Sequence, residues 1–363
     1  MNILGVMSGN SCDGLDLCDV DIEIDSSYNL SYKIKNYSTI PFLEDEKKFI
    51  HSIRENEKYK IKENETKLTT IFINKIRMFS SLEHLDYISC HGQTVSHIDK
   101  VSSLQLFDAK LCYDSLGIPV IYNFRDNDIM NGGNGAPLMP FLDWLLFSDS
   151  SKDIVTLNVG GISNISHIPT SKLKDEVRGF DTGPGMCLVD MACRKLFNSS
   201  YDDDSKFSNQ GLVDKKLLNE LLDLPLVKKN PPKSMDINDF GEDIISQISI
   251  SNSKLNNYDI LRTLVEFTVE SIHYNIYNFI KLDRRKFDLV ISGGGTDHPL
   301  VRQGLIRKGY KVKSVSKFGI ASSAKEAFLM ALLGASRAIN LKSNIPTVTG
   351  ACKYVTLGEI YAG

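Results

Sequence analysis

The sequence predicts an α/β protein built from two related halves. Short apolar segments, typical of buried strands, end repeatedly in polar, glycine-rich loops, as strands do at the ligand edge of an α/β sheet. Segments with apolar residues at helical spacing lie between them. Near residue 150 the pattern of strand, glycine-polar turn and return strand starts again. This indicates a structural repeat whose two copies share a pattern of residue types but not the same residues.

Composition is ordinary for a soluble globular protein and argues against several other classes. The 363 residues suffice for two domains or one large one, and a net charge of −3 gives no argument for nucleic acid or an anionic membrane. The 7 cysteines are widely spaced without a Cys-x-x-Cys pair, so we expect neither a disulfide framework nor a zinc site, and a cytoplasmic location. We expect no signal peptide and no membrane span.

The first half alternates predicted strands with solvated helices. The chain begins with a hairpin, in which a buried strand over 2–7 and a half-exposed strand over 15–24 flank the polar turn 8–14. The later predictions, in order, are a strand region over 25–40, helices over 44–82, a strand then loop over 85–94, a strand then loop over 118–128, and the glycine-rich segment 132–138.

The second half repeats the hairpin and then becomes helical. Its strands are predicted over 153–159 and 165–168, on either side of the turn 160–164. The remaining predictions, in order, are a polar loop over 198–210, a long amphipathic helix over 258–281, a strand over 287–292 followed by the loop 293–297, a helix over 321–340 and an extended tail over 346–351.

One carboxylate, Asp181, stands inside the glycine-rich stretch 179–185, ahead of an apolar, helix-compatible run. We expect this stretch to be a loop that continues neither a helix nor a strand, with glycines that let backbone N–H groups approach a ligand. A carboxylate beside a helix N-terminus suits a general base facing a polar or anionic substrate. The alternative is an Asx-type turn, in which Asp181 bonds its own loop.

Three glycine-polar loops, 8–14, 160–164 and 293–297, each follow a short apolar strand. None is a Walker A loop or a dinucleotide-binding fingerprint. Two such hairpins and a late triple glycine suit a nucleotide clamped between two halves, with phosphates held by backbone N–H groups and hydroxyls. Each loop taken singly is also compatible with a plain turn.

With these motifs in place, the sequence resembles the 1,6-anhydro-N-acetylmuramic acid kinases, within the superfamily of actin, sugar kinases and heat-shock-chaperone ATPases. The matching motifs run in family order along nearly the whole chain. They are 5–16, 89–94, 124–126, 132–137, 158–164, 179–185, 231–234, 292–295, 325–328 and 348–351.

The resemblance implies two ribonuclease-H-like α/β domains with ATP in the cleft between them. The first domain would comprise residues 1–130 plus 341–363, and the second 131–340. Such kinases open the anhydro ring of a cell-wall recycling sugar with ATP and water, giving N-acetylmuramic acid 6-phosphate and ADP. Family members are usually cytoplasmic homodimers that need Mg²⁺. Two alternatives stay open: a related kinase of another amino sugar, and a non-catalytic nucleotide-binding regulator.

The resemblance also implies roles for single residues, with Asp181 as the catalytic base that deprotonates water. The nucleotide would be bound by Gly9, Asn10, Ser11, Cys12, Asp13, Gly14, Leu15, Asp16, Gly160, Gly161, Asn164, Gly293, Gly294 and Gly295. The sugar would be bound by His91, Gln93, Thr94, Arg125, Thr182, Gly183, Gly185, Lys233 and Glu326.

Several of these residues have ordinary alternatives. Arg125 would pair with a lactyl carboxylate or a phosphate, or else form an ion pair with Asp126 or Asp128. His91 would bond the sugar, or serve as a structural histidine that orders the Gly92 loop.

Three further site residues with ordinary alternatives are Asp13, Lys233 and Glu326. Asp13 would organise Mg²⁺ and its waters, or else cap its turn. Lys233 and Glu326 would contact the sugar, or else be an ordinary surface lysine and an exposed helical glutamate.

Three departures from the family pattern bear on the sugar more than on the kinase reaction. Asn10 stands where the family usually has threonine, and Met186 stands where it usually has asparagine. Methionine offers only a weak acceptor in place of an amide. After Ser234 the usual Thr-Gly-Arg-Glu is replaced by Met-Asp-Ile-Asn, so one basic side chain is missing.

Overall fold

The structure is a computed structural model, and it describes residues 1–9, 12–54, 61–79, 82–235, 237–240, 244–251 and 254–363. The chain divides into two compact units. Unit 1 comprises residues 1–146 and 320–363, and unit 2 comprises residues 147–319.

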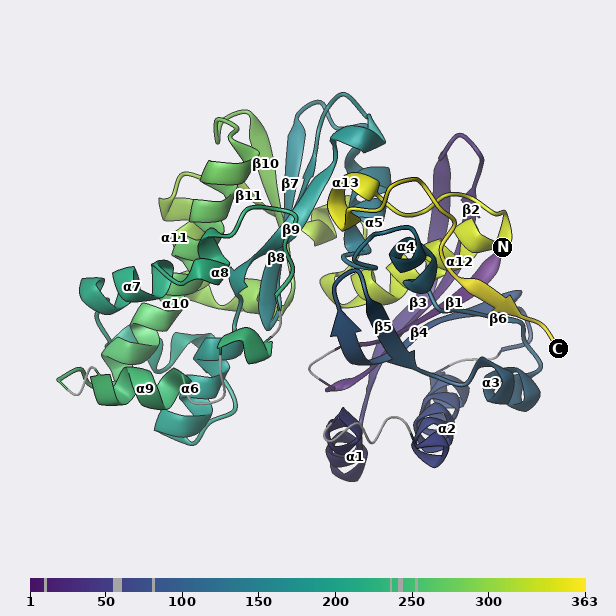
Figure 1. Cartoon of the computed structure of the whole chain (residues 1–363), viewed down its shortest axis with the longest axis horizontal. Coiled ribbons are helices and arrows are strands. Elements are labelled where there is room, and N and C mark those ends of the chain that lie inside the picture. Colours follow the sequence, from purple (N-terminus) through teal and green to yellow (C-terminus); the bar gives the residue numbers. More distant parts are fainter. Residues whose placement is uncertain (10–11, 55–60, 80–81, 236, 241–243, 252–253) are drawn as a thin grey trace. The chain divides into compact units, whose positions relative to one another are not determined.

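Unit 1 is built on a mixed sheet with the order β12-β6-β4-β1-β2-β3, and β5 pairs with β4 (Figure 1). β1 is parallel to β4 and antiparallel to β2, and β3 continues the antiparallel edge. The strands are β1 (Asn2–Ser8), β2 (Gly14–Ile24), β3 (Leu30–Pro41), β4 (Tyr87–Ile98), β5 (Ser102–Leu106), β6 (Val120–Tyr122) and β12 (Glu359–Tyr361). The helices are α1 (Glu44–Arg54), α2 (Lys62–Phe79), α3 (Ala109–Leu116), α4 (Asp126–Met130), α5 (Met139–Phe147), α12 (Lys325–Ala338) and α13 (Pro346–Thr349).

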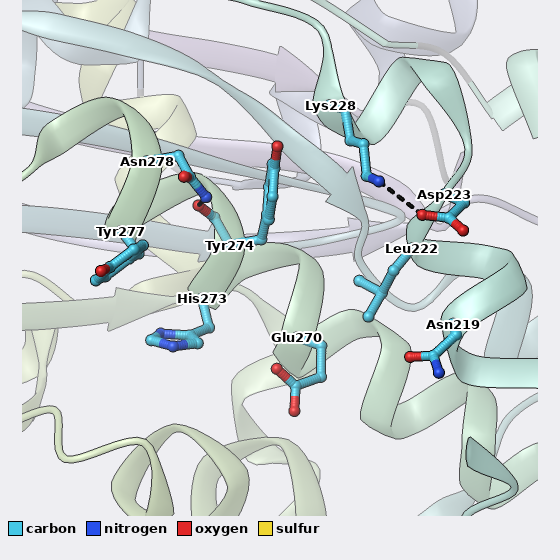
Figure 2. Close-up of a pocket in the computed structure, with 9 residues that line it drawn as sticks. All are labelled: Asn219, Leu222, Asp223, Lys228, Glu270, His273, Tyr274, Tyr277 and Asn278. Carbon is cyan, nitrogen blue, oxygen red and sulfur yellow. Dashed lines mark hydrogen bonds and ion pairs between the residues drawn. The ribbon is translucent and has the colours of Figure 1, made fainter. Parts of the chain in front are cut away.

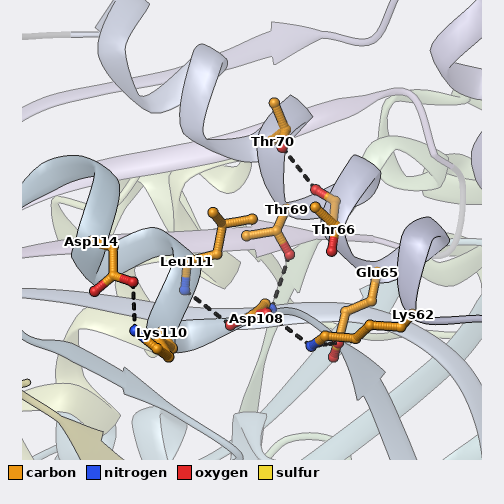
Figure 3. Close-up of polar contacts among 9 residues, drawn as sticks. All are labelled: Lys62, Glu65, Thr66, Thr69, Thr70, Asp108, Lys110, Leu111 and Asp114. Carbon is orange, nitrogen blue, oxygen red and sulfur yellow. Dashed lines mark hydrogen bonds and ion pairs between the residues drawn. The ribbon is translucent and has the colours of Figure 1, made fainter.

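Asp108 fixes the start of α3 and joins it to α2 (Figure 3). Its carboxylate accepts a 2.9 Å hydrogen bond from the N–H of Leu111, which caps the helix, and a 2.8 Å bond from Lys62. Its own N–H donates to the Thr69 hydroxyl at 2.9 Å. One residue therefore sets both the helix boundary and the contact between the two helices.

The segments 131–146 and 320–340 pack within unit 1, whereas the boundaries expected from sequence, near 130 and 340, put both in the second domain. α12 lies so close to β1 that a Cβ on Gly5 would stand 1.9 Å from the Ala327 carbonyl oxygen. Small residues on α12 allow this approach. A buried 2.7 Å ion pair between Lys325 and Asp143 joins α12 to α5. Contacts made across the fold, rather than chain order, decide where these segments belong.

Unit 2 is built on a second mixed sheet with the order β11-β10-β7-β8-β9 (Figure 1). Its strands are β7 (Asp153–Val159), β8 (Ile162–Ile168), β9 (Arg178–Pro184), β10 (Phe287–Ser292) and β11 (Val312–Ser314). Its helices are α6 (Cys187–Phe197), α7 (Lys215–Leu222), α8 (Pro225–Lys228), α9 (Ile244–Ser251), α10 (Asn257–Asn275), which continues as a π-helix over Ile276–Ile280, and α11 (Pro299–Arg307).

The two sheets repeat one design, which confirms the predicted α/β fold of two ribonuclease-H-like domains. In each unit an antiparallel hairpin, β1–β2 or β7–β8, is extended by a third antiparallel strand on one side. On the other side of β1 and of β7, two strands follow in parallel. Apolar side chains of β7, β9, β10 and α10 fill the core of unit 2, with Phe180, Phe267 and Phe287 among the largest fully buried ones. Of the described helices, none has both the length and the apolar character needed to cross a membrane.

Two local predictions in unit 1 are wrong. The tail expected to be extended over 346–351 contains the short helix α13, which begins at Pro346, a residue suited to a first helical turn. The loop expected after Cys90 is part of β4, which continues to Ile98. Its pairing with β1 shifts between Val6 and Ser8, and Gly92 adopts φ +79° at this irregularity.

Candidate active site

Asp181 lies within strand β9, and the expectation that 179–185 forms a loop is wrong as far as Pro184. On β8, Ser163 pairs with Gly183 and Asn164 pairs with Asp181, so Thr182 is an extra residue that forms a β-bulge. Bulges often turn a neighbouring side chain at functional sites. The half-buried Asp181 carboxylate accepts a 2.7 Å hydrogen bond from the Met235 N–H.

The chain after Pro184 is joined to the turn between β7 and β8. The N–H groups of Gly185 and Met186 donate to the carbonyls of Gly161 and Gly160 at 2.9 and 2.8 Å. A Cβ on Gly185 would stand 2.1 Å from the Gly160 carbonyl oxygen, so only glycine fits there. The chain at the end of β9, four residues after Asp181, and the glycine turn between β7 and β8 are thus one hydrogen-bonded piece.

The triple glycine, Gly293 to Gly295, packs against the end of β7 and against Met186. Gly293 adopts φ +88°, and a Cβ on it would stand 2.6 Å from the Val159 carbonyl oxygen. A Cβ on Gly295 would stand 2.7 Å from Met186 Cγ. Met186, the departure that raised the question of another sugar, therefore packs against the triple-glycine loop.

Lys233 is buried rather than a surface lysine, with 3% of its area exposed. Its ammonium donates to the Val227 carbonyl at 2.8 Å and lies 5.3 Å from the centre of the Phe279 ring. Burial lowers the pKa of Lys233 to about 8, against the opposing effect of Asp181. Its backbone carbonyl accepts from the N–H of Asp181 at 3.2 Å, so this segment lines β9.

In unit 1 the predicted phosphate turn joins β1 to β2. Asn10 and Ser11 lie outside the described residues. The side chains of Cys12 and Leu15 are buried in the apolar core, so contacts to a phosphate from these residues would come from their backbone. Asp13 is exposed.

Gln93 and His91 lie on β4 beside this turn. The buried Gln93 accepts a 2.6 Å hydrogen bond from the Ser8 hydroxyl and donates to the Gly9 carbonyl at 3.4 Å, so it ties the turn to β4. Thr94 follows on the same strand. Nδ1 of His91 lies 3.1 Å from the Gly92 carbonyl, to which only a protonated nitrogen can donate. Burial lowers the pKa of His91 to about 3, with Arg125 adding to the effect, so the neutral ring presents Nε2 as an acceptor.

Among the described residues, Arg125 has no carboxylate within ion-pair distance. The alternative that it forms an ion pair with Asp126 or Asp128 is therefore wrong. One of its terminal nitrogens donates to the Ser103 hydroxyl at 3.1 Å, while its Nε is buried without a partner there. Burial lowers its pKa to about 10, which leaves the guanidinium charged at neutral pH. A half-buried guanidinium with no carboxylate partner among the described residues is suited to binding an anion.

Glu326 is half-buried in the first turn of α12 rather than fully exposed. Burial and the charge of Asp16 raise its pKa, and Lys325 opposes the rise. Burial also raises the pKa of Asp16, with Asp13 adding to it. Carboxylate oxygens of this kind suit Mg²⁺. Across the described part of the chain, no cluster of three or more metal-ligating side chains occurs.

Comparison with known proteins decides the family. The whole chain, residues 1–363, matches the family described as "Anhydro-N-acetylmuramic acid kinase". The chain belongs to this family. It is similar to the anhydro-N-acetylmuramic acid kinases of Bacillus cereus (strain Q1), with 37% identity over 380 residues, and of Bacillus thuringiensis subsp. konkukian (strain 97-27), with 36% over 379. Each match covers 99% of this chain and 99% of the relative.

Membership makes the protein an ATP-dependent kinase, a phosphotransferase that acts on 1,6-anhydro-N-acetylmuramic acid. Among solved structures, it is distantly similar to the activator of 2-hydroxyisocaproyl-CoA dehydratase from Clostridium difficile (TM-score 0.45, 9% identity, 93% of this chain and 97% of that chain). It is also distantly similar to a ROK family glucokinase from Streptomyces griseus (TM-score 0.41, 10% identity, 91% and 97%). We draw no functional conclusion from these distant likenesses.

Residues that support the kinase motifs were missed from sequence. In unit 1 the buried carboxylate of Asp128 accepts hydrogen bonds from the Gly135 N–H at 2.9 Å and from Asn344 and Thr349 at 2.8 Å each. It joins the glycine-rich segment 132–137 to the C-terminal motif. In unit 2, α10 carries polar residues at Thr268, Ser271 and Asn275. Their spacing on one face of an apolar helix was the available signal.

A surface pocket of about 600 Å³ lies on the other side of α10, and none of the predicted site residues lines it (Figure 2). Several of its polar groups already have partners: Lys228 donates to Asp223 at 2.6 Å, and Asn278 donates to the Tyr274 carbonyl at 2.8 Å. We assign no ligand to it.

Proposed function

We propose that this kinase opens the anhydro ring with water and phosphorylates O6, with Asp181 as the general base. The observation that carries the proposal is the half-buried Asp181 carboxylate, which lies on a bulged strand whose end is hydrogen-bonded to the glycine turn between β7 and β8. A base in such a place can deprotonate water next to a bound phosphate ester.

The reaction balances with a single carboxylate. Asp181 accepts a proton from water, and the resulting oxygen attacks the anomeric carbon C1 of the sugar. The bond between C1 and O6 breaks, and O6 takes the γ-phosphoryl group of ATP. The products are N-acetylmuramic acid 6-phosphate and ADP. The phosphoryl group traps the leaving oxygen, so no separate acid is required.

The predicted binding residues receive complementary roles. In unit 2, the loops of Gly160 and Gly161 and of Gly293 to Gly295 would offer N–H groups to the nucleotide. In unit 1, the turn after Gly9 would bind phosphate oxygens. Mg²⁺, when bound, would offset phosphate charge, and Asp13 and Asp16 would bind it or its waters.

Arg125 and His91 would hold the sugar. The uncompensated guanidinium of Arg125 is suited to the lactyl carboxylate, and Nε2 of His91 would accept a hydrogen bond from a sugar N–H or O–H. From the family resemblance we also propose a homodimer and a cytoplasmic location. Sedimentation velocity of the purified chain tests the dimer.

The test compares Asp181→Asn with Asp223→Asn, a control on the exposed surface of unit 2. We expect Asp181→Asn to keep ATP binding and lose at least about 10³-fold in kcat, in the range seen when a catalytic base is removed. The control should turn over normally. In ¹⁸O-water the wild-type product should carry one solvent oxygen at the anomeric carbon. Full turnover by Asp181→Asn, or product without solvent oxygen, would falsify the proposal.

A further inference from the structure

The bulge at Thr182 leaves groups that the strand ladder does not satisfy, and side chains from elsewhere in unit 2 bind them. The Thr182 side chain is fully buried, and its hydroxyl donates to the Ser163 carbonyl at 3.1 Å. The Thr182 carbonyl accepts a 2.8 Å hydrogen bond from the side-chain amide of Asn275, which lies 93 residues away in sequence on α10. Buried carbonyls need such partners, because they have lost water.

Asn275 belongs to a polar stripe on the buried face of α10, formed by Thr268, Ser271 and Asn275 at positions i, i+3 and i+7. All three side chains are at most 1% exposed. The Thr268 hydroxyl donates to the Gly185 carbonyl at 2.6 Å. Ser271 packs against Gly183, where a Cβ would stand 2.7 Å from its hydroxyl oxygen. Each member of the stripe therefore contacts one residue of the segment that follows Asp181.

The stripe is distinct from the rest of the helix. Apart from Thr263, whose hydroxyl accepts from the Asp214 N–H at 2.9 Å, the other buried residues of α10 are apolar and lie in the core of unit 2. A polar side chain is costly there unless it is hydrogen-bonded. On the pocket side, Asn278 bonds only back to its own helix among the described contacts, at the Tyr274 carbonyl (Figure 2). Asn275 makes the equivalent bond, to the Ser271 carbonyl at 2.9 Å, and in addition reaches Thr182.

We propose that this stripe is a positioning element of the kinase reaction: Thr268 and Asn275 fix the backbone on both sides of Gly183, and thereby hold the Asp181 carboxylate in the direction that catalysis requires. The inference rests on Asp181 being the base, as proposed above. Neither residue needs to touch sugar or nucleotide. Loss of either bond would leave substrate binding intact and misdirect the base.

The test uses matched variants in the full-length enzyme. Thr268→Val removes the hydroxyl at nearly constant shape, and Thr268→Ser restores it. Asn275→Leu removes the bond to Thr182, and Asn278→Leu is the control on the same helix. For Thr268→Val and Asn275→Leu we expect kcat to fall about 10- to 100-fold, the range for a small misplacement of a catalytic group. KM for ATP and for the sugar should change less than about threefold, since only transition-state interactions are lost.

Thr268→Ser and Asn278→Leu should retain near-wild-type kcat. If Asn275→Leu does not fold, the comparison of Thr268→Val with Thr268→Ser still tests the inference, because valine and threonine have the same shape. Provided that Asp181→Asn is inactive, either of two results overturns the inference. One is a folded Thr268→Val enzyme with wild-type kcat, and the other is a Thr268→Val enzyme in which only KM changes. If Asp181→Asn itself turns over normally, the proposed function fails instead.

Discussion

Gly185 approaches Gly160 so closely that a Cβ on Gly185 would stand 2.1 Å from the Gly160 carbonyl oxygen. This contact joins the segment after Asp181 to the turn between β7 and β8. Because the obstructing atom belongs to the backbone, it cannot move without displacing the turn.

Gly185→Ala should therefore destabilise unit 2 by about 3 kcal/mol, as overpacking of a fixed site does, and lower kcat/KM about 100-fold. Gly294→Ala is the matched control for stability alone, since a Cβ at Gly294 would meet no atom within 4 Å whereas the residue belongs to the proposed nucleotide loop. Thermal and urea unfolding measure the stability, and ADP release measures the activity. Equal unfolding midpoints for the two variants would show that the close contact has no consequence.

Arg125 lacks a carboxylate partner in the described structure, so its charge is available to a ligand. Arg125→Gln should raise the KM of the anhydro sugar about 100-fold, equivalent to about 3 kcal/mol of a buried charge-assisted contact. The KM of ATP should change less than threefold. Arg285→Gln, which removes an exposed arginine paired with Asp283, is the control. The opposite pattern, with only the ATP KM affected, would assign Arg125 to the phosphates.

Lys233 should make stability depend on alkaline pH in a defined direction. Its pKa is lowered to about 8 by burial, below the ordinary lysine value of 10.5. Between these values the unfolded chain binds more protons than the folded chain, so this residue makes stability rise with pH there. Wild type should gain free energy of unfolding relative to Lys233→Met between pH 8 and 10. Parallel curves for the two proteins would contradict the assignment.

Asp108 should matter for stability but not for catalysis. Asp108→Ala removes the cap of α3 and the bond to Lys62, and should lower the free energy of unfolding by about 1 kcal/mol. Asp114→Ala, which breaks only an exposed i,i+4 pair with Lys110, should cost less than about 0.5 kcal/mol. Both variants should keep wild-type kcat. Chemical denaturation compares them, and a larger loss for Asp114→Ala would refute the capping argument.

Met186 packs against Gly295, in the loop proposed to bind the nucleotide. Met186→Asn, which restores the usual family residue, should therefore alter the KM of ATP by about two- to fivefold, as expected for the loss of a small apolar contact. The KM of the anhydro sugar should stay unchanged. Initial rates at varied ATP and varied sugar separate the two effects. A change in the sugar KM alone would return Met186 to the sugar site.

Most elements could be predicted from local pattern. β10 is buried over its whole length and carries the apolar run Leu289 to Ile291, as expected for a strand with both faces covered. β1 and β7 precede similar turns because their units repeat one design. The helix α13 could not be predicted this way, because four residues are too few to show a helical period.

The bulges also escaped prediction. The irregularities at Gly92 and Thr182 depend on how β4 pairs with β1 and how β9 pairs with β8. The sequence of one strand does not specify its register against a partner strand. For the same reason Asp181 was expected in a loop. Its chemistry was visible from the sequence, but its place on a strand was not.

The sequence by itself determined the chemical parts of this kinase: the carboxylate of Asp181, the glycines that admit close backbone contacts, and the alternation that builds two sheets. Only the tertiary structure decided which groups are buried and what they bind. It placed Lys233 in the interior, left Arg125 without a carboxylate within the described chain, and brought Asn275 to Thr182. The physical reason is that strand and helix periods are local, whereas desolvation and hydrogen-bond partners come from residues far apart in sequence.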